Sequence, residues 1–340
     1  MVVGCRVEFG APTSTTSTAE ASCREAKAPD GKVVLYTSAY REVSDALVAL
    51  AAQRLPGVEV IVFQGGSEKV ASRLDADLAA GRAGADVLLV SDPLLSRRLK
   101  DAGQLLPRVS PRATPIDRRL VDLDNAFVAA RASTMVIAFH TQKTQRNAVP
   151  DSLGALLLDE KHAPDVAFGD PLSSGTALFT SVVVGGGDVA FLGPLRRRGA
   201  SVGGGNAVVL QKVLSGERRY GVVLLENVLL ARARGEPVDF VVPNDPVVIP
   251  GDVAILKDTQ NREAAAALVD LILSPEGQAL MRGSDGRMHA VDPRIPPPDD
   301  DVPELATLLD RRPLPLALID RVAKDRGLLV AAIERALLSP

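Results

Sequence analysis

The chain has 340 residues, long enough for two domains that each bury a core of their own. Its 39 basic and 42 acidic residues give a net charge of -3, which argues against a nucleic-acid binder, and 3% aromatic residues leave few platforms for stacking bases. The 46% hydrophobic content is typical of a globular protein. The sequence contains no run of about 18 uncharged apolar residues, which a membrane-spanning helix would need.

The chain opens MVVGC, in which Val2 to Cys5 match the lipobox of bacterial lipoproteins. The charged and long apolar segments of a signal peptide are missing before it, so a chance VVGC is the alternative. We expect Cys5 to be lipidated and residues 1–30 to be a signal remnant and flexible tether, since residues 6–30 lack hydrophobic periodicity. The role of Cys23 stays open, because a disulfide to Cys5 would only cross-link the N-terminal tether to itself.

Strand-like and helix-like patterns alternate from residue 32 to residue 107. The expected elements are strand 32–36, helix 42–55, strand 58–66, helix 67–83, strand 85–92 and helix 93–107. Ser67 with Glu68 is an N-cap signal, and Pro93 is favourable near a helix start. This order predicts a mostly parallel sheet with right-handed crossovers, covered by helices.

Small polar residues follow each of these three strands, where ligands of open α/β sheets bind. Each group alone is best explained as an ordinary strand-to-helix cap, but three together suggest one rim of a ligand cleft. The candidates are Thr37, Ser38, Tyr40, Ser67, Ser91 and Asp92.

The pattern changes at residues 127–140, which we expect to form a strand pair after a loop rich in Arg and Pro. A second α/β unit follows, then a helix from about residue 261 with Asn261 as its cap, and a helical tail. No repeat of 20–50 residues is visible. We expect two α/β lobes, the first completed by the C-terminal third of the chain.

The stretch GDPLSSGTALFTSVVV is the strongest local signal of a site, because Ser173, Ser174, Gly175 and Thr176 lead directly into an apolar helix. Free backbone N–H groups at a helix start, with hydroxyls beside them, can hold an anion, and glycine allows close approach. The alternative is a well-capped helix with no ligand.

Two further helix starts carry candidates. Asn206 follows a glycine loop that is not a phosphate-binding Walker A loop, since no GK[ST] follows. Glu226 and Asn227 follow a short apolar strand; they point into the cleft, or Glu226 is simply the first exposed residue of the next helix.

Signals of catalysis are missing from the sequence. His140, His162 and His289 stand in no nucleophile or HExxH pattern, and there is no GxSxG or CxxC motif. We therefore expect no enzyme, no cofactor and no metal site, although folding could still bring carboxylates together.

The order of segments resembles the substrate-binding proteins of bacterial ABC importers, in the branch that binds ferric ion, phosphonates and sugar phosphates. The matching stretches span about residues 32–285, with SPEGQALM the most specific. They are residues 33–60, 65–107, 169–177, 206–217 and 247–281.

This resemblance implies a type II periplasmic-binding-protein fold: two α/β lobes joined by crossing strands near residues 127–135 and 243–252, closing on a ligand by hinge motion. It implies that Ser173–Thr176 form the family's anion-binding loop, with Asn206 as a further ligand contact. The implied division is residues 31–130 plus 247–340 for the first lobe and 131–246 for the second.

The sequence departs from the iron branch, which uses adjacent tyrosines where this chain has Glu226 and Asn227. Ferric iron favours anionic oxygen ligands such as phenolates, and the tyrosine pair that would supply them is missing. We therefore expect the ligand to be a phosphonate or a phosphorylated small molecule, whose amine or hydroxyl groups bind Asp92 or Glu226. Internal pairing of these carboxylates would remove that argument. A ferric receptor with a synergistic anion and an enzyme on the same fold are the alternatives.

The resemblance also implies a periplasmic or cell-surface location and an ABC permease of the inner membrane as partner. The chain would act as a monomer, anchored through Cys5.

Overall fold

The computed structural model describes residues 29–338, and the predictions for Cys5 and Cys23 lie outside them, as does nearly all of the predicted tether. Within this range no helix combines the length and the apolar character that crossing a bilayer requires.

The described strands form one nine-stranded sheet, in which β8 pairs with β4 beside the main order β2-β1-β3-β9-β4-β7-β5-β6. The strands are β1 (Gly31–Thr37), β2 (Val58–Gln64), β3 (Val87–Val90), β4 (Val128–His140), β5 (Val166–Phe168), β6 (Ser201–Val202), β7 (Tyr220–Leu224), β8 (Val238–Val241) and β9 (Val247–Ile255).

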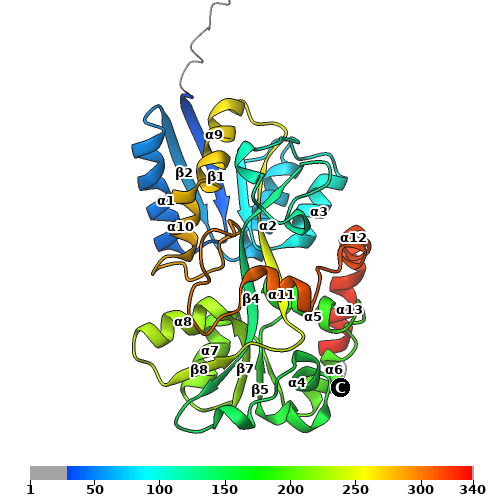
Figure 1. Ribbon diagram of the computed structural model, residues 1–340. Coiled ribbons are helices and arrows are strands. Elements are labelled where there is room, and N and C mark those ends of the chain that lie inside the picture. Colours follow the sequence, from blue (N-terminus) through cyan, green and yellow to red (C-terminus); the bar gives the residue numbers. More distant parts are fainter. Residues whose placement is uncertain (1–28, 339–340) are drawn as a thin grey trace, which may run out of the picture.

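The first lobe, at the top of Figure 1, is built on β2, β1 and β3, which pair in parallel. Asp92 accepts hydrogen bonds from the backbone N–H groups of Leu94 and Leu95 and Pro93 takes the first helical position, which explains where α3 begins. The helices are α1 (Arg41–Arg54), α2 (Ser67–Ala79), α3 (Pro93–Asp101), α9 (Arg262–Ile272) and α10 (Pro275–Arg282).

The second lobe, at the bottom of Figure 1, is built on β7, β5 and β6, again paired in parallel. Its helix α5 is buried along almost its whole length, which matches the continuous apolar run in the sequence. The helices are α4 (Leu153–Leu157), α5 (Gly175–Val184), α6 (Leu192–Arg197), α7 (Asn206–Leu214) and α8 (Leu225–Ala233).

The expected strand pair at residues 127–140 is wrong: β4 is one continuous strand that runs from lobe to lobe. Its first half pairs with β9 and its second half with β7 and β8, and every residue of it is buried. A strand buried on both faces has no alternation of polar residues to mark its length. β4 and β9 are the two connections between the lobes that the resemblance implied.

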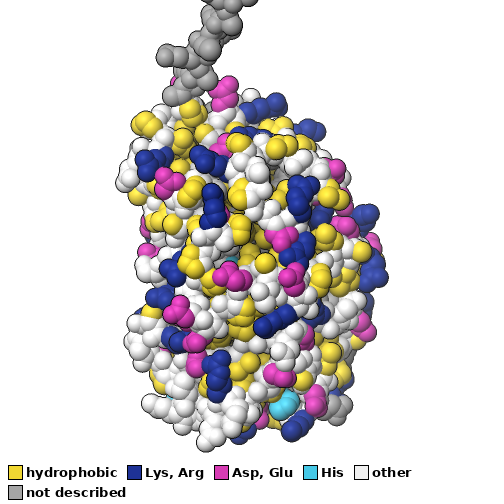
Figure 2. Space-filling view, viewed as in Figure 1, with side chains coloured by type: hydrophobic (Ala, Val, Ile, Leu, Met, Phe, Trp, Pro, Cys, Tyr) yellow, Lys and Arg dark blue, Asp and Glu magenta, His cyan; other side chains and the backbone are white. Residues whose placement is uncertain are grey.

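Each lobe has its own apolar core. One includes Val33 and Leu35 of β1 with Leu268 of α9, and the other includes Phe168 of β5 and Phe179 of α5. On the face shown in Figure 2, acidic and basic side chains are interspersed and no large area carries one sign of charge.

The C-terminal helices are α11 (Leu305–Arg311), α12 (Leu316–Lys324) and α13 (Arg326–Leu338). Of these helices, α12 and α13 run along one side of both lobes, while α11 lies near the middle of the molecule (Figure 1). α12 packs against α3 of the first lobe and α13 against α6 of the second. The division of the chain at residues 130 and 247 remains a prediction. It assigns α13 to the first lobe, although α13 contacts α6 of the second lobe.

Candidate ligand-binding site

A cavity of about 250 Å³ lies between the two lobes, and residues of both line it. The predicted residues that the structure brings to this cavity are Ser38, Tyr40, Ser67, Ser91, Ser173, Ser174, Gly175, Thr176, Asn206, Glu226 and Asn227. Segments far apart in the sequence thus meet at the carboxyl ends of parallel strands, as expected for this class of sheet.

The structure does not bring Thr37 and Asp92 to the cavity. The Thr37 hydroxyl is buried and accepts a hydrogen bond from the backbone N–H of Ala39 at 3.0 Å. The Asp92 carboxylate is fully buried and caps α3. Both side chains therefore serve the local backbone, which is the ordinary-cap alternative stated for the strand ends.

The rim contributed by the first lobe is a set of serines held by one another. The Ser38 hydroxyl accepts from the backbone N–H of Ser91 at 3.0 Å, and the Ser67 hydroxyl donates to the carbonyl of Ser91 at 3.2 Å. Gly66, not Ser67, is the N-cap of α2, so the Ser67 hydroxyl is free to make this contact. The buried Ser91 Oγ has no hydrogen-bond partner in the described chain.

The rim contributed by the second lobe is a short chain of hydrogen bonds. Ser174 caps α5, and its hydroxyl lies 3.1 Å from the Thr176 hydroxyl. Asn206 donates to Thr176 at 3.0 Å and accepts from the backbone N–H of Leu224 at 3.3 Å. These contacts fix the starts of α5, α7 and α8 relative to one another.

The N-termini of five of the described helices face this cavity. The N-cap residues of α1, α2, α5, α7 and α8 all line it, and they are Tyr40, Gly66, Ser174, Gly205 and Leu224. Within residues 29–338, four of these caps make no side-chain capping hydrogen bond; Ser174 is the exception. Backbone N–H groups and positive helix ends are thus directed at one small volume, which favours an anion.

Sequence reasoning missed Arg131, the positive charge of the cavity. It is 3% exposed and follows a register shift in β4, a bulge that re-aims a side chain. Gly251 on β9 makes room for it, since a Cβ there would lie 2.6 Å from Arg131 Cγ. Its guanidinium donates to Ser38 Oγ and to Met288 Sδ, both at 3.1 Å, while Nε has no partner among the described residues.

Glu226 is the acidic group of the cavity and is 1% exposed. Its Oε1 accepts a hydrogen bond of 2.6 Å from the Ser133 hydroxyl, and its Oε2 has no partner in the described part of the chain. Burial raises the pKa of Glu226 to about 7, against the opposing effects of that hydrogen bond and of the Arg131 charge. Its proton occupancy therefore changes near neutral pH.

Tyr40 connects the lobes across the cavity. Its hydroxyl donates to Asn227 Oδ1 at 3.1 Å, joining the start of α1 to α8. Burial raises the pKa of Tyr40 well above its ordinary value, so the phenol stays protonated. Ser67 and Gly175 approach from opposite lobes as well, since a Cβ on Gly175 would lie 2.9 Å from Ser67 Cβ.

Metal ligands are not gathered here. No cluster of three His, Cys, Asp or Glu side chains that could hold a metal ion occurs in residues 29–338. Of the histidines, none lines this cavity, and His289 instead contacts the carbonyl of Pro303 through Nε2 at 3.0 Å.

Two lobes on one sheet, joined by crossing strands around a polar cavity, form the architecture that the resemblance implied. The family profile described as bacterial extracellular solute-binding protein matches residues 33–284, and the chain belongs to that family. The resemblance found in the sequence is thereby confirmed. A comparison with curated protein sequences finds no match.

Solved structures confirm the predicted type II fold. Iron-bound HitA from Pseudomonas aeruginosa is 21% identical with a TM-score of 0.75, covering 89% of this chain and 99% of its own. AfuA from Actinobacillus pleuropneumoniae, with exogenous fructose-6-phosphate bound, is 20% identical with a TM-score of 0.76, covering 91% and 99%. A ferric binding protein from Campylobacter jejuni is 17% identical with a TM-score of 0.71, covering 88% and 99%. At these identities the likeness concerns the fold.

Proposed function

We propose that this protein is the solute receptor of an ABC importer and captures a small phosphate- or phosphonate-bearing molecule between its lobes. The observation that carries the proposal is the meeting of five helix N-termini and buried Arg131 at one cavity. Burying an arginine with incomplete pairing costs on the order of several kcal/mol, so its presence there favours a ligand role over a purely structural one.

The rest of the cavity suits a ligand that also carries a hydrogen-bond donor. Glu226 Oε2 and Ser91 Oγ are buried, line the cavity and have no partner among residues 29–338. Buried polar atoms without partners are costly, and a hydroxyl or ammonium group on the ligand would satisfy the carboxylate. A phosphorylated sugar or an aminoalkylphosphonate has both kinds of group, and the volume of about 250 Å³ limits it to a small molecule.

A ferric-ion receptor is the weaker alternative, although HitA is similar and is described as iron-bound. Tyr40 is the sole described tyrosine that lines the cavity, and its phenol is protonated and donates to Asn227. Iron held by anionic oxygens would need several such groups.

An enzyme on this fold is the alternative of another class. No histidine lines the cavity to serve as a general base, and Glu226 is the sole carboxylate among the described residues that line it, so the site holds no carboxylate pair. We therefore propose a binding protein without catalysis.

The proposed setting follows from the family. The partner is an ABC permease that binds the closed conformation. The protein acts as a monomer in the periplasm or at the cell surface. Anchoring through lipidated Cys5 is part of the proposal and concerns a residue outside the described range.

Native mass spectrometry of the purified protein, followed by a thermal-shift screen, tests this function. The screen contains inorganic phosphate, 2-aminoethylphosphonate, fructose 6-phosphate and ferric citrate. We expect a stoichiometric phosphate- or phosphonate-bearing ligand that raises Tm and leaves with its mass unchanged. Stabilisation by iron alone would replace this reading with the ferric one, and a ligand released as a product would indicate an enzyme.

A further inference from the structure

The C-terminal helices make a third connection between the lobes, beside β4 and β9. α12 is fixed to the first lobe by its packing against α3. Its Ile319 and Val322 lie with Leu94 of α3 in the apolar cluster that extends from the core of the second lobe. Arg97 of α3 and Asp320 of α12 add an ion pair of 3.2 Å. The connection therefore starts firmly on the first lobe.

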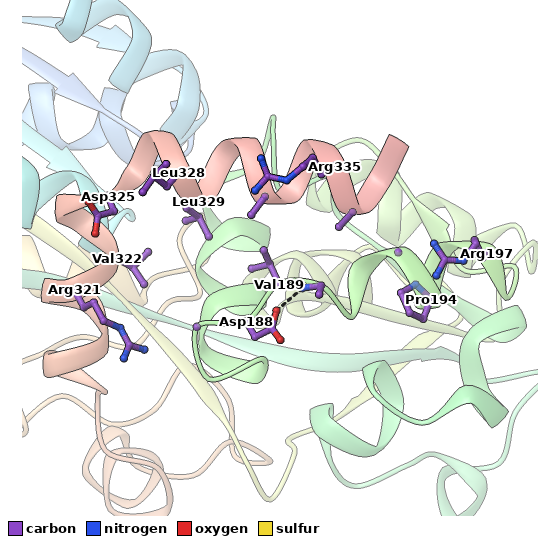
Figure 3. Close-up of a pocket in the computed structure, with 15 residues that line it drawn as sticks. Asp188, Val189, Pro194, Arg197, Arg321, Val322, Asp325, Leu328, Leu329 and Arg335 are labelled. Carbon is purple, nitrogen blue, oxygen red and sulfur yellow. Dashed lines mark hydrogen bonds between the residues drawn. The ribbon is translucent and has the colours of Figure 1, made fainter. Parts of the chain in front are cut away.

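α13 is fixed to the second lobe. Leu329, Ile333 and Leu337 belong to the same cluster as Leu192 and Leu195 of α6. Figure 3 shows α13 lying along the α6 segment, with a cavity of about 670 Å³ between them. Because α12 and α13 meet at residue 325, a movement of one lobe relative to the other must be absorbed there or at the contacts of α13.

Arg326, the first residue of α13, reaches back across to the first lobe. Its Nη2 lies 2.7 and 2.8 Å from the two carboxylate oxygens of Glu68 on α2. Its Nη1 lies 3.7 Å from Oδ2 of Asp92, and neither of these two atoms has a hydrogen-bond partner in the described chain. The Arg326 side chain is 18% exposed, Glu68 20% and Asp92 0%.

The two carboxylates stand directly behind the rim of the cavity. Glu68 follows Ser67, and Asp92 follows Ser91, and both serines line the cavity. Glu68 also faces the opposite lobe, since a Cβ on Gly175 would lie 3.5 Å from its Oε1. Without Arg326, two negative charges would stand beside a site that faces anions.

Building on the proposed function, we propose that Arg326 is an interlobe clasp, a positioning residue that holds α2 and α3 over the cavity in the closed arrangement. In this proposal the movement of the lobes is absorbed at residue 325, so α13 moves with the second lobe and opening separates the Arg326–Glu68 pair. The clasp adds to the closed state a contact that the open state lacks, and it offsets the charges of Glu68 and Asp92. Both effects favour closure around an anion.

Interlobe distances measured by double electron–electron resonance test the clasp. Cys5 and Cys23 are replaced by Ser, and spin labels are placed at Gln53 on α1 and Gln211 on α7, both exposed. The closed fraction is recorded without ligand and over a series of phosphate concentrations for the wild type, R326E, the exchange E68R/R326E, and K324E. Lys324 is an exposed residue of the same segment with a comparable charge, so K324E is the matched control.

We expect R326E to lower the ratio of closed to open molecules by about fivefold or more, within the usual range of coupling between states. The exchange E68R/R326E should restore the ratio, and K324E should match the wild type. R326E curves that coincide with the wild type, or a K324E effect as large as that of R326E, would overturn the clasp. Failure of the proposed function has a different signature, because the wild-type distances would then not respond to phosphate or to fructose 6-phosphate at all. The clasp is in that case judged on the ligand-free distributions.

Discussion

Arg131 shows where a site residue could have been found in the sequence and was not. It is the single Asp, Glu, Lys or Arg in AFVAARASTMVIAFH, and a single charge inside a buried strand needs a partner or a ligand. The signal was present, but its interpretation depends on the bulge in β4 and on Gly251 of β9, which only the folded chain brings together.

Replacing Arg131 with Gln should weaken binding of the phosphate- or phosphonate-bearing ligand by about ten- to a hundredfold, because a charge-assisted hydrogen bond contributes about 1.5–3 kcal/mol. Titration calorimetry measures the loss. Arg262 on α9 is exposed, and Arg262→Gln removes the same charge far from the cavity. Equal affinities for wild type and Arg131→Gln would exclude Arg131 from the site.

The raised pKa of Glu226 predicts that the stability of the protein depends on pH. Its folded pKa of about 7 lies above its ordinary value of 4.5, so the folded state binds a proton that the unfolded state has released. Its stabilising contribution is fully present below pH 4.5 and is lost as pH rises through about 7. The difference amounts to about 3 kcal/mol at most.

We therefore expect Glu226→Gln to flatten the decline of unfolding free energy between about pH 5 and about pH 8, measured by urea denaturation. Asp252, whose pKa burial raises to about 6, contributes the same sign in both proteins and cancels in the comparison. Identical slopes for the two proteins would show that Glu226 does not titrate in this range.

Small polar residues at strand ends could be predicted to be important, but not what each would do. Ser91 and Asp92 are adjacent, yet Ser91 lines the cavity while Asp92 caps α3. Their roles depend on which way each side chain turns at the helix start, and the sequence contains both possibilities equally.

At the scale of elements, the order of the six strands and helices in residues 31–101 was predicted, and each starts within two residues of its expected start, because periodicity and cap signals agreed there. Their ends were predicted less well: α2 stops at Ala79 instead of residue 83, and α3 at Asp101 instead of residue 107. β4 was predicted as a strand pair, since thirteen consecutive buried residues carry no period-2 pattern. The start of α5 was predicted from Ser174 and Gly175. Its contact with the opposite lobe could not be predicted.

Gly175 tests the meeting of α5 and α2. Ala is a better helix former than Gly, so Gly175→Ala should leave the ligand-free protein at least as stable. Its Cβ would lie 2.9 Å from Ser67 Cβ, which forces the lobes apart and should abolish most of the ligand-induced rise in Tm. In Gly203→Ala the added Cβ meets nothing within 4 Å, so this variant should respond like the wild type. An undiminished Tm shift in Gly175→Ala would show that closure does not bring these helix starts together.

At the scale of the whole molecule, the resemblance predicted two lobes and two crossing strands, and β4 and β9 are those strands. The path of α12 and α13 was beyond prediction, because amphipathic helices indicate that a face is buried but not against which lobe. Leu329 and Ile333 have the same chemistry whichever core they join.

The most direct test of the account is anomalous X-ray diffraction from crystals grown with arsenate, a tetrahedral oxyanion that substitutes for phosphate. We predict one strong arsenic peak in the cavity between the starts of α5 and α7, within hydrogen-bond distance of Arg131. Arsenic bound elsewhere, or a cavity without a peak at saturating arsenate, would contradict the claim that this protein closes around a small phosphate-like anion.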